Sequence, residues 1–316
     1  MLLTISIVII GDQPLLLPCL ESIEAQTQVE HEIYLVENQA SPAFLQQVKQ
    51  RFPKIKFIHN PQRLSFAANH NQVLRQCQGQ LALLLNDDTL ILDQALDKMV
   101  NFLETQPSQI GVIGCTNIDQ YENFTLSCYP IPTAKTIIWQ HAYLSRWLPG
   151  RAYEQYLAQA KGKAPFPVGW VKGSCMMIRK EVIEQVGYLD EDFFLFSEEV
   201  DYCQRAKQAG FAVYHMPQAR ILHYESTTTN RFVGIKLRGH YLSKLYFLAK
   251  HGMARDLYLV RIWFILELLV KCLIRGIGGM TNRQPDARQR LQVYLDLIHI
   301  CFTYRGEPAR ALLKQD

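Results

Sequence analysis

Several signatures that would assign a function directly are missing from this 316-residue sequence. No Gly-x-Gly-x-x-Gly turn follows the first apolar run, and no Gly-x-x-x-x-Gly-Lys-Ser/Thr loop occurs anywhere. The patterns Gly-x-Ser-x-Gly and His-Glu-x-x-His are absent as well. These absences argue against a nicotinamide-dependent oxidoreductase. A phosphate-bearing ligand would therefore need a metal ion or basic side chains in place of a glycine cradle.

Cysteine pairs and a secretion signal are also lacking. None of the eight cysteines forms a Cys-x-x-Cys pair, which excludes zinc-ribbon spacing and is typical of reduced thiols in a cytosolic protein. The apolar residues 2–10 have no basic segment before them and no small-residue cleavage site after them, so they predict a first strand. We therefore expect a cytoplasmic location.

The charge is unevenly distributed along the chain. The net charge is +4, and 48% of the residues are hydrophobic, as in an ordinary globular protein. Residues 231–290, however, carry twelve Lys and Arg against three Asp and Glu, while residues 1–230 have an acidic balance. The C-terminal region alone is therefore expected to meet an anionic partner.

Strand and helix patterns alternate through the first part of the chain. Four strand–helix pairs in succession favour an α/β fold with a mostly parallel central sheet. The expected strands are residues 4–10, 32–36, 56–58, 80–85 and 110–114, with helices at 15–26, 42–51, 66–77 and 92–104 between them. Further on, short strands are expected at residues 175–179, 211–216 and 220–222.

Residues 83–89, Leu-Leu-Leu-Asn-Asp-Asp-Thr, join a buried strand to two acids without a spacer. A buried carboxylate is costly unless it is paired, and ligands of open α/β sheets bind beyond the carboxyl ends of the strands. The acids therefore indicate either a site for a hard divalent cation or a turn that caps the next helix. The pattern alone does not separate the two.

Two later features have the same ambiguity. Glu198, Glu199 and Asp201 begin an expected helix, where acids suit the helix dipole and Asp201 can pair with Arg205; one of the acids could instead be a general base. His223 ends a strand and could be a metal ligand, a phosphate contact or an ordinary surface residue.

Taken in order, these pieces resemble the family-2 glycosyltransferases, in particular the rhamnosyltransferase-like branch that acts on bacterial cell-surface glycans. The resemblance runs from about residue 4 to residue 250. It rests on the Asn-Asp-Asp-Thr segment and on Trp-Val-Lys-Gly-Ser at 170–174. It also includes Gly-Tyr-Leu-Asp-Glu-x-Phe-Phe at 187–194, Glu-Glu-x-Asp-Tyr-Cys-x-Arg at 198–205, and then His223.

The resemblance implies a GT-A type nucleotide-sugar-binding fold and inverting transfer with Mg²⁺ or Mn²⁺. It implies a catalytic domain over 1–230, with a nucleotide-binding half (1–114) and an acceptor half (115–230), followed by a basic, helical C-terminal region (231–316). Asp88 and His223 would hold the metal, and Glu199 would be the general base. The donor would be bound by Gly11, Glu37, Asn38, Arg63, Phe66, Asn71, Asn86 and Asp87, and the acceptor by Trp170, Gly173 and Glu198.

The nucleotide side departs from the family pattern. Gly-Asp-Gln at 11–13 replaces Thr-Tyr-Asn, Glu37 replaces the base-binding Asp, and Arg63 replaces an Asn. The glycine that usually follows Asn71 is also absent. The nucleotide is then held differently or more weakly, which leaves a catalytically degenerate sugar-nucleotide-binding or assembly protein of the same fold as the alternative.

Residues 257–275 form the longest apolar run. Arg261, Glu267, Lys271 and Arg275 fall in one stripe of about 120° on a helix, and four charges argue against a membrane span. The pattern predicts either an interfacial helix over 255–275, with the basic stripe toward anionic headgroups and Trp263 and Phe264 inserted, or a helix packed against protein. The sequence as a whole predicts an inverting glycosyltransferase with a nucleotide-sugar donor, a glycan or lipid-linked acceptor and no nucleic-acid partner. It would act in the cytoplasm or on the inner face of the cell membrane.

Overall fold

The computed structural model describes residues 2–141, 151–193, 195–224, 233–281 and 287–313. The chain divides into two compact units. The first unit comprises Met1–Ile131, Ala152–Glu191 and Glu198–Thr227, and the second comprises Pro132–Arg151, Asp192–Ser197 and Thr228–Asp316. The expected domain boundary at residue 230 is close to the last of these divisions, whereas two short earlier segments belong to the second unit. Each unit is described separately below.

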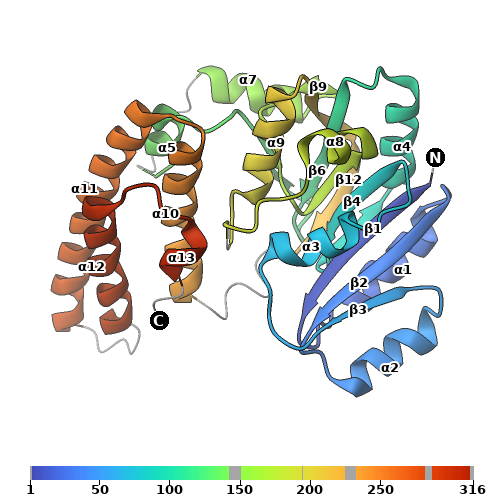
Figure 1. The fold of residues 1–316 in the computed structure, drawn as a ribbon, viewed down its shortest axis with the longest axis horizontal. Helices are drawn as coiled ribbons and strands as arrows, with labels where there is room; N and C mark the ends of the chain where they lie inside the picture. The colour runs from blue at the N-terminus through green and yellow to red at the C-terminus, as the bar shows by residue number, and fades with distance from the viewer. Residues whose placement is uncertain (1, 142–150, 194, 225–232, 282–286, 314–316) are drawn as a thin grey trace. The chain divides into compact units, whose positions relative to one another are not determined.

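A mixed sheet forms the centre of the first unit, in the order β3-β2-β1-β4-β11-β6-β12-β5 (Figure 1). β1 lies parallel to β2 and β4, β2 to β3, and β6 to β12. β11 runs antiparallel between β4 and β6, and β5 runs antiparallel to β12. The strands are β1 Leu3–Ile10, β2 His31–Asn38, β3 Lys56–Asn60, β4 Leu81–Asn86, β5 Thr89–Leu92, β6 Ile110–Ile118, β11 Cys175–Arg179 and β12 Ala212–His223. The predicted mostly parallel sheet is confirmed.

Helices cover both faces of this sheet. Alternate residues of β4 belong to different cores: Leu83 and Leu85 pack with α1, α2 and α4, whereas Ala82 and Leu84 pack with α3, α8 and α9. Side chains of Ser41 and Ser65 cap α2 and α3 by accepting from Phe44 N and Ala68 N. The helices are α1 Leu16–Gln26, α2 Pro42–Arg51, α3 Phe66–Leu74, α4 Ala95–Thr105, α7 Arg151–Ala160, α8 Lys180–Val186 and α9 Glu198–Gln208.

Short strands complete the first unit. β7 pairs with β6, β9 pairs with β12, and β8 and β10 form a separate two-stranded sheet. Their bounds are β7 Phe124–Thr125, β8 Cys128–Tyr129, β9 Phe166–Pro167 and β10 Trp170–Val171.

Several predicted boundaries were wrong. The helix expected over 66–77 ends at Leu74, and the strand expected at 110–114 continues to Ile118. Two further differences change which elements are present. The helix expected from residue 92 begins at Ala95, because residues 89–92 form β5 and pair with β12. The strands expected at 211–216 and 220–222 are one strand, β12, which continues through a register shift between Met216 and Arg220. Both errors arise from pairing between distant segments, which a local pattern does not contain.

The second unit is helical in the part that the structure describes. α11 packs against α12, α10 and α5, and Gly252, with φ of +67°, lies in the short connection between α10 and α11. None of the described helices has the length and hydropathy needed to cross a membrane. The helices are α5 Ala134–His141, α10 Val233–Lys250, α11 Ala254–Thr281, α12 Ala287–Thr303 and α13 Ala309–Leu313.

Candidate functional site

The two acids of the Asn-Asp-Asp-Thr segment occupy the turn between β4 and β5. Because β5 pairs with the last residues of β12, Thr89 lies opposite His223. His223 Nε2 is 3.1 Å from Asp88 Oδ1, and Tyr224 N donates to Asp88 O at 3.0 Å. Asp88 and His223 are both buried. The sheet thus brings together two residues that are 135 positions apart in the sequence.

Two amides hold the His223 ring. Asn86 Nδ2 is 3.2 Å from His223 Nε2, and Asn117 Nδ2 is 3.4 Å from Nδ1 on the other edge of the ring. Asn117 also donates to Ser174 Oγ at 2.9 Å, and its own Oδ1 is buried without a hydrogen-bond partner among the described residues. Sequence reasoning missed Asn117. Its available signal was an amide near the end of β6, an otherwise apolar strand.

The donor atoms at this turn fit a divalent cation. Metal–ligand distances of about 2.1 Å place two neighbouring ligand atoms of an octahedral ion about 3 Å apart, close to the observed His223–Asp88 separation. Among the described residues no group of three or more His, Cys, Asp or Glu side chains gathers to form a closed metal site. The carboxylate of Asp88 and the imidazole of His223 are the two candidate ligands at this turn.

Asp87 adds a second carboxyl group at the same turn. Burial and the adjacent Asp88 carboxylate raise the pKa of Asp87 to about 8. A cation beside Asp88 would relieve this repulsion.

Phe66, Gly173 and Glu199 come from three distant segments and meet in the first unit. A Cβ added to Gly173 would lie 3.1 Å from Phe66 Cζ and 3.8 Å from Glu199 Cβ, so a larger residue here would require the Phe66 ring to shift by a few tenths of an ångström. Phe66 packs edge-on against His70 with ring centroids 4.3 Å apart, and the His70 ring is bonded to Ser6 Oγ at 2.8 Å. Burial lowers the pKa of His70 to about 3, so this ring stays neutral.

The two acids that begin α9 have different environments. Glu198 is 4% exposed, and its Oε2 accepts no hydrogen bond within the described part of the chain. Burial, followed by repulsion from Glu199, raises the pKa of Glu198 well above its ordinary value. Glu199 is only half-buried and lies beside Gly173. Adjacent carboxyls held in such different surroundings can take different roles, one as a neutral acid and one as a base.

Glu198→Gln is expected to stabilise the fold more as the pH rises. The carboxyl of Glu198 titrates near 4.5 in the unfolded chain and well above that in the folded protein. The cost that arises from its raised pKa is absent below pH 4.5 and grows as the pH increases toward the folded-state pKa. The gain in Tm should therefore be small at pH 4 and largest near pH 8 when followed by circular dichroism. Glu184→Gln, at an exposed position on α8, is the matched control. An equal shift at both pH values would contradict the interpretation.

Part of the predicted donor site, namely Gly11, Glu37, Asn38 and Arg63, lies at the ends of β1 and β2 and in the loop after β3. Gly11, with φ of +67°, donates from its backbone to Asn38 O at 2.8 Å. The Asn38 side chain donates a hydrogen bond to Ile9 O at 3.0 Å and accepts one from Leu64 N at 3.2 Å. Asn38 therefore fixes the loop that carries Arg63, a half-buried residue whose pKa is lowered by burial.

Two of the departures from the family pattern have structural partners. Glu37 is buried, contacts His59 Nδ1 through Oε1, and accepts from Ala40 N at 3.2 Å through Oε2. Asp12 accepts from the backbone N and the hydroxyl of Ser41, each at 2.7 Å. The altered residues therefore order the loops around the β1 and β2 ends.

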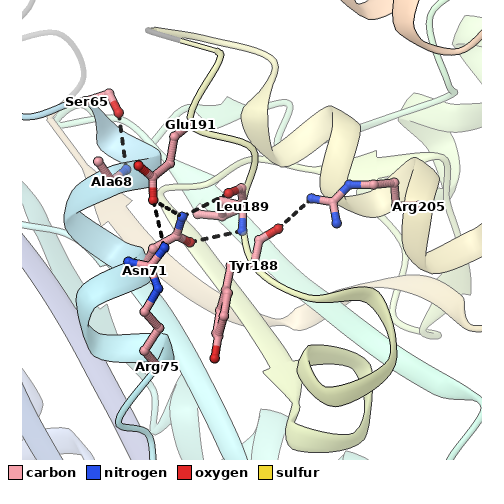
Figure 2. Close-up of polar contacts among 8 residues, drawn as sticks. All are labelled: Ser65, Ala68, Asn71, Arg75, Tyr188, Leu189, Glu191 and Arg205. Atoms are coloured by element: carbon pink, nitrogen blue, oxygen red, sulfur yellow. Dashed lines mark hydrogen bonds and ion pairs between the residues drawn. The ribbon is translucent and has the colours of Figure 1, made fainter.

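The Asn71 amide links α3 to the loop before residue 192 (Figure 2). It donates to Leu189 O and Glu191 Oε1, both at 2.9 Å, and accepts from Leu189 N at 3.0 Å. Arg75 adds an ion pair to Glu191 at 3.1 Å, and Arg205 donates to Tyr188 O at 2.7 Å. Asn71 therefore positions this loop, and a contact between Asn71 and the donor remains a prediction. The expected Asp201–Arg205 ion pair is confirmed, at 2.8 Å.

Trp170 lies on β10 and stacks on Tyr129, with ring centroids 4.7 Å apart and 21° between the planes. Its indole Nε1 is buried and makes no hydrogen bond to any described residue. A Cβ on the neighbouring Gly169 would lie 2.2 Å from Ile131 N, so glycine is required for this close approach. The Trp170 ring is thus packed against Tyr129, and its indole N–H has no hydrogen-bond partner among the described residues.

Comparison with known sequences gives a family match over most of the chain. Residues 3–241 match the family described as "Glycosyltransferase like family 2". The chain is 25% identical over 243 residues to the N-acetylglucosaminyl-diphospho-decaprenol L-rhamnosyltransferase of Mycobacterium tuberculosis, which covers 73% of this chain and 78% of that protein. It is 29% identical over 234 residues to the O-antigen biosynthesis protein RfbC of Myxococcus xanthus, over 69% of this chain and 17% of that longer protein.

Solved structures share the fold. A mannosyltransferase from Pyrobaculum calidifontis, in complex with GDP-Man and Mn²⁺, has a TM-score of 0.55 at 15% identity and covers 99% of this chain and 84% of its own. GalNAc-T7, with UDP, GalNAc and Mn²⁺, has a TM-score of 0.53 at 16% identity, over 79% of this chain and 50% of that chain. The expected GT-A fold, with C-terminal helices after the sheet domain, is confirmed.

Proposed function

Because the chain belongs to the glycosyltransferase-like family 2, we propose that it is a metal-dependent inverting glycosyltransferase that uses a nucleotide-sugar donor. The observation that carries this proposal is the pairing of Asp88 with His223 at the carboxyl edge of the sheet. A rhamnosyl group is the donor sugar that the relatives' names favour.

Asp88 and His223 would hold a Mg²⁺ or Mn²⁺ ion, which supplies positive charge to the leaving diphosphate when it is bound. Asn86 and Asn117 lie against the two ring nitrogens of His223 and so restrict the orientation of the ring. Gly11, Glu37, Asn38, Arg63, Phe66, Asn71 and Asp87 are proposed to form or support the remaining donor site.

Glu199 is proposed to accept the proton of the acceptor hydroxyl while the new glycosidic bond forms at the donor's anomeric carbon. A single displacement needs a base on the acceptor side and no enzyme nucleophile. Glu199 suits this role because it is half-buried, whereas burial and the neighbouring Glu199 raise the pKa of Glu198 and so favour the neutral form of that carboxyl. Glu198, Trp170 and Gly173 are the proposed acceptor contacts.

The acceptor is proposed to be a lipid-linked or growing glycan of a cell-surface polysaccharide. The name of the mycobacterial relative specifies a diphospho-decaprenol acceptor, and that of the myxobacterial relative specifies O-antigen biosynthesis. An acceptor of this kind would place the protein in the cytoplasm at the inner face of the cell membrane.

A non-catalytic sugar-nucleotide binder of the same fold is the second candidate. It is favoured by one observation: both carboxylate oxygens of Glu37, the expected base-binding residue, already have partners within the protein. Such a protein would bind a donor without turning it over.

A donor screen tests the proposal. Nucleotide-sugars are added with Mn²⁺ or with EDTA, and both the thermal shift and slow donor hydrolysis are recorded. We expect one class of donor to raise Tm and to be hydrolysed only with Mn²⁺. Donor binding without hydrolysis or transfer would favour the non-catalytic candidate, and no response to any donor would exclude both.

A further inference from the structure

Of the two arrangements that the sequence left open for this helix, the interfacial one placed the charged stripe outward and the apolar side chains in lipid, and α11 has these two faces the opposite way round. Lys271 pairs with Glu267 and donates to Tyr241 OH at 2.9 Å, and His141 bonds Glu267 Oε2 at 3.0 Å. Phe264, expected to insert into lipid, is fully buried. The predicted orientation was therefore wrong for these residues. The side chain of Arg275, the last member of the stripe, lies outside the described residues.

Arg261 also points back toward the protein. Its guanidinium donates to Cys301 O at 2.7 Å and to Phe302 O at 2.8 Å, at the end of α12. Free carbonyls at a helix C-terminus attract a cation. Three of the four charges of the stripe, Arg261, Glu267 and Lys271, therefore have partners within the second unit and need no lipid headgroups to pair with.

The opposite face of α11 is apolar and exposed. At 100° per residue its exposed members fall within an arc of about 160°, which leaves Val260, Phe264 and Leu268 to pack inward. The arc contains eight of the twelve large hydrophobic side chains found exposed among the described residues. They are Tyr258, Leu259, Ile262, Leu266, Leu269, Val270, Leu273 and Ile274, each between 40% and 64% exposed. A contiguous apolar surface of this kind marks an interaction site.

The positive charge of the second unit indicates which kind of partner this apolar face would bind. Arg255 is exposed and precedes Leu259 by one helical turn, so it lies at the N-terminal end of the apolar arc. Lys250, Arg305 and Arg310 of the same unit are also exposed. With twelve basic and three acidic residues in 231–290, a second copy of this unit would be repelled by like charge, whereas an anionic surface would be attracted.

We propose that the exposed apolar face of α11 docks on an anionic lipid surface, with the helix lying in the plane of the interface. Tyr258 and Arg255 would sit at the headgroup level at one end, and the aliphatic side chains that follow would enter the acyl boundary. Docking would bring the protein to the membrane that carries the proposed lipid-linked acceptor, so the biological purpose of docking rests on the proposed function. The surface itself is defined without the catalytic site.

Vesicle flotation of the full-length protein tests the docking surface. The protein is mixed with phosphatidylcholine vesicles that contain or lack phosphatidylglycerol, in the absence of any donor. We expect flotation with the anionic vesicles, at least tenfold weaker flotation with the neutral ones, and a further loss at high salt. The double variant Leu266→Gln/Leu273→Gln should reduce the bound fraction at least tenfold.

Two control variants test whether the loss of vesicle binding is specific to the apolar face of α11. Tyr121→Ser removes a 75% exposed aromatic residue from the first unit and should leave flotation unchanged. Lys271→Gln should lower Tm, because it removes the lysine that pairs with the Glu267 carboxylate, while the folded protein still floats. Circular dichroism checks that each variant is folded.

Failure of wild-type protein to float with anionic vesicles would overturn the proposal. So would a double variant that binds vesicles normally. A change from dimer to monomer in the double variant, with no vesicle binding by wild type, would show that the face joins two copies. Transfer to a short-chain soluble acceptor analogue, measured without vesicles, reports on the proposed enzyme function separately from docking.

Discussion

Asp88→Ala is expected to abolish Mn²⁺-dependent donor binding and to lower transfer by about 10²–10³. Asp88 is the only carboxylate placed within 3.1 Å of His223 in the described structure. Without it a cation would keep one protein ligand, and the developing charge on the diphosphate would lose its compensation, a type of interaction worth about 10²–10³ in rate. Calorimetric titration of donor with Mn²⁺, with Mg²⁺ and after EDTA treatment measures the effect.

Asp93→Ala is the matched control for this variant. Asp93 is an exposed acid that pairs with Arg220 at the end of β5, so its loss should leave metal-dependent binding unchanged. If Asp88→Ala kept wild-type donor affinity and wild-type dependence on Mn²⁺, the assignment of the metal to this turn would be wrong.

Glu199→Gln is expected to spare donor binding and to reduce kcat by about 10²–10⁴, the usual contribution of a general base. Glutamine keeps the size of the side chain beside Gly173 and Phe66 but cannot accept the proton of the acceptor hydroxyl. The acidic limb of the pH profile of kcat/KM should disappear with the carboxylate. Steady-state kinetics and donor titration of the same preparation separate the two effects.

Glu184→Gln makes the same chemical change at an exposed position of α8 and should keep the wild-type kinetics. A Glu199→Gln enzyme with wild-type kcat would remove Glu199 as the base. A loss of donor affinity equal to the loss of kcat would instead give this residue a role in the donor site.

The sheet was predictable because its evidence is local. Each strand of the first half is an apolar run followed by a helical period, and successive pairs of this kind form parallel sheets. Boundaries at β5 and β12 were not predictable, since residues 89–92 become a strand only by pairing with a segment about 130 residues later. Local patterns therefore identified the architecture and misplaced the elements whose partners are distant.

In the candidate site, too, the sequence identified some residues and only the tertiary structure identified others. The order of motifs identified Asp88, Glu199 and His223 as candidates, and the sheet brings Asp88 and His223 together. Asn117, which contacts His223 and Ser174, had no motif of its own, and the Asn71 amide holds a backbone loop. Hydrogen-bond partners far apart in the sequence decide what an amide does, and a pattern of residue types does not name them.

α11 shows most clearly what the sequence and the tertiary structure each determine. The sequence by itself determined an amphipathic helix with a charged stripe and a basic surrounding region, because a period of 3.6 residues fixes which side chains share a face. Only the tertiary structure decided which face is covered: His141 and Tyr241 satisfy Glu267 and Lys271, so the charges turn inward and the apolar face is exposed. Periodicity groups side chains into faces, but the polar partners on neighbouring helices determine which face is buried.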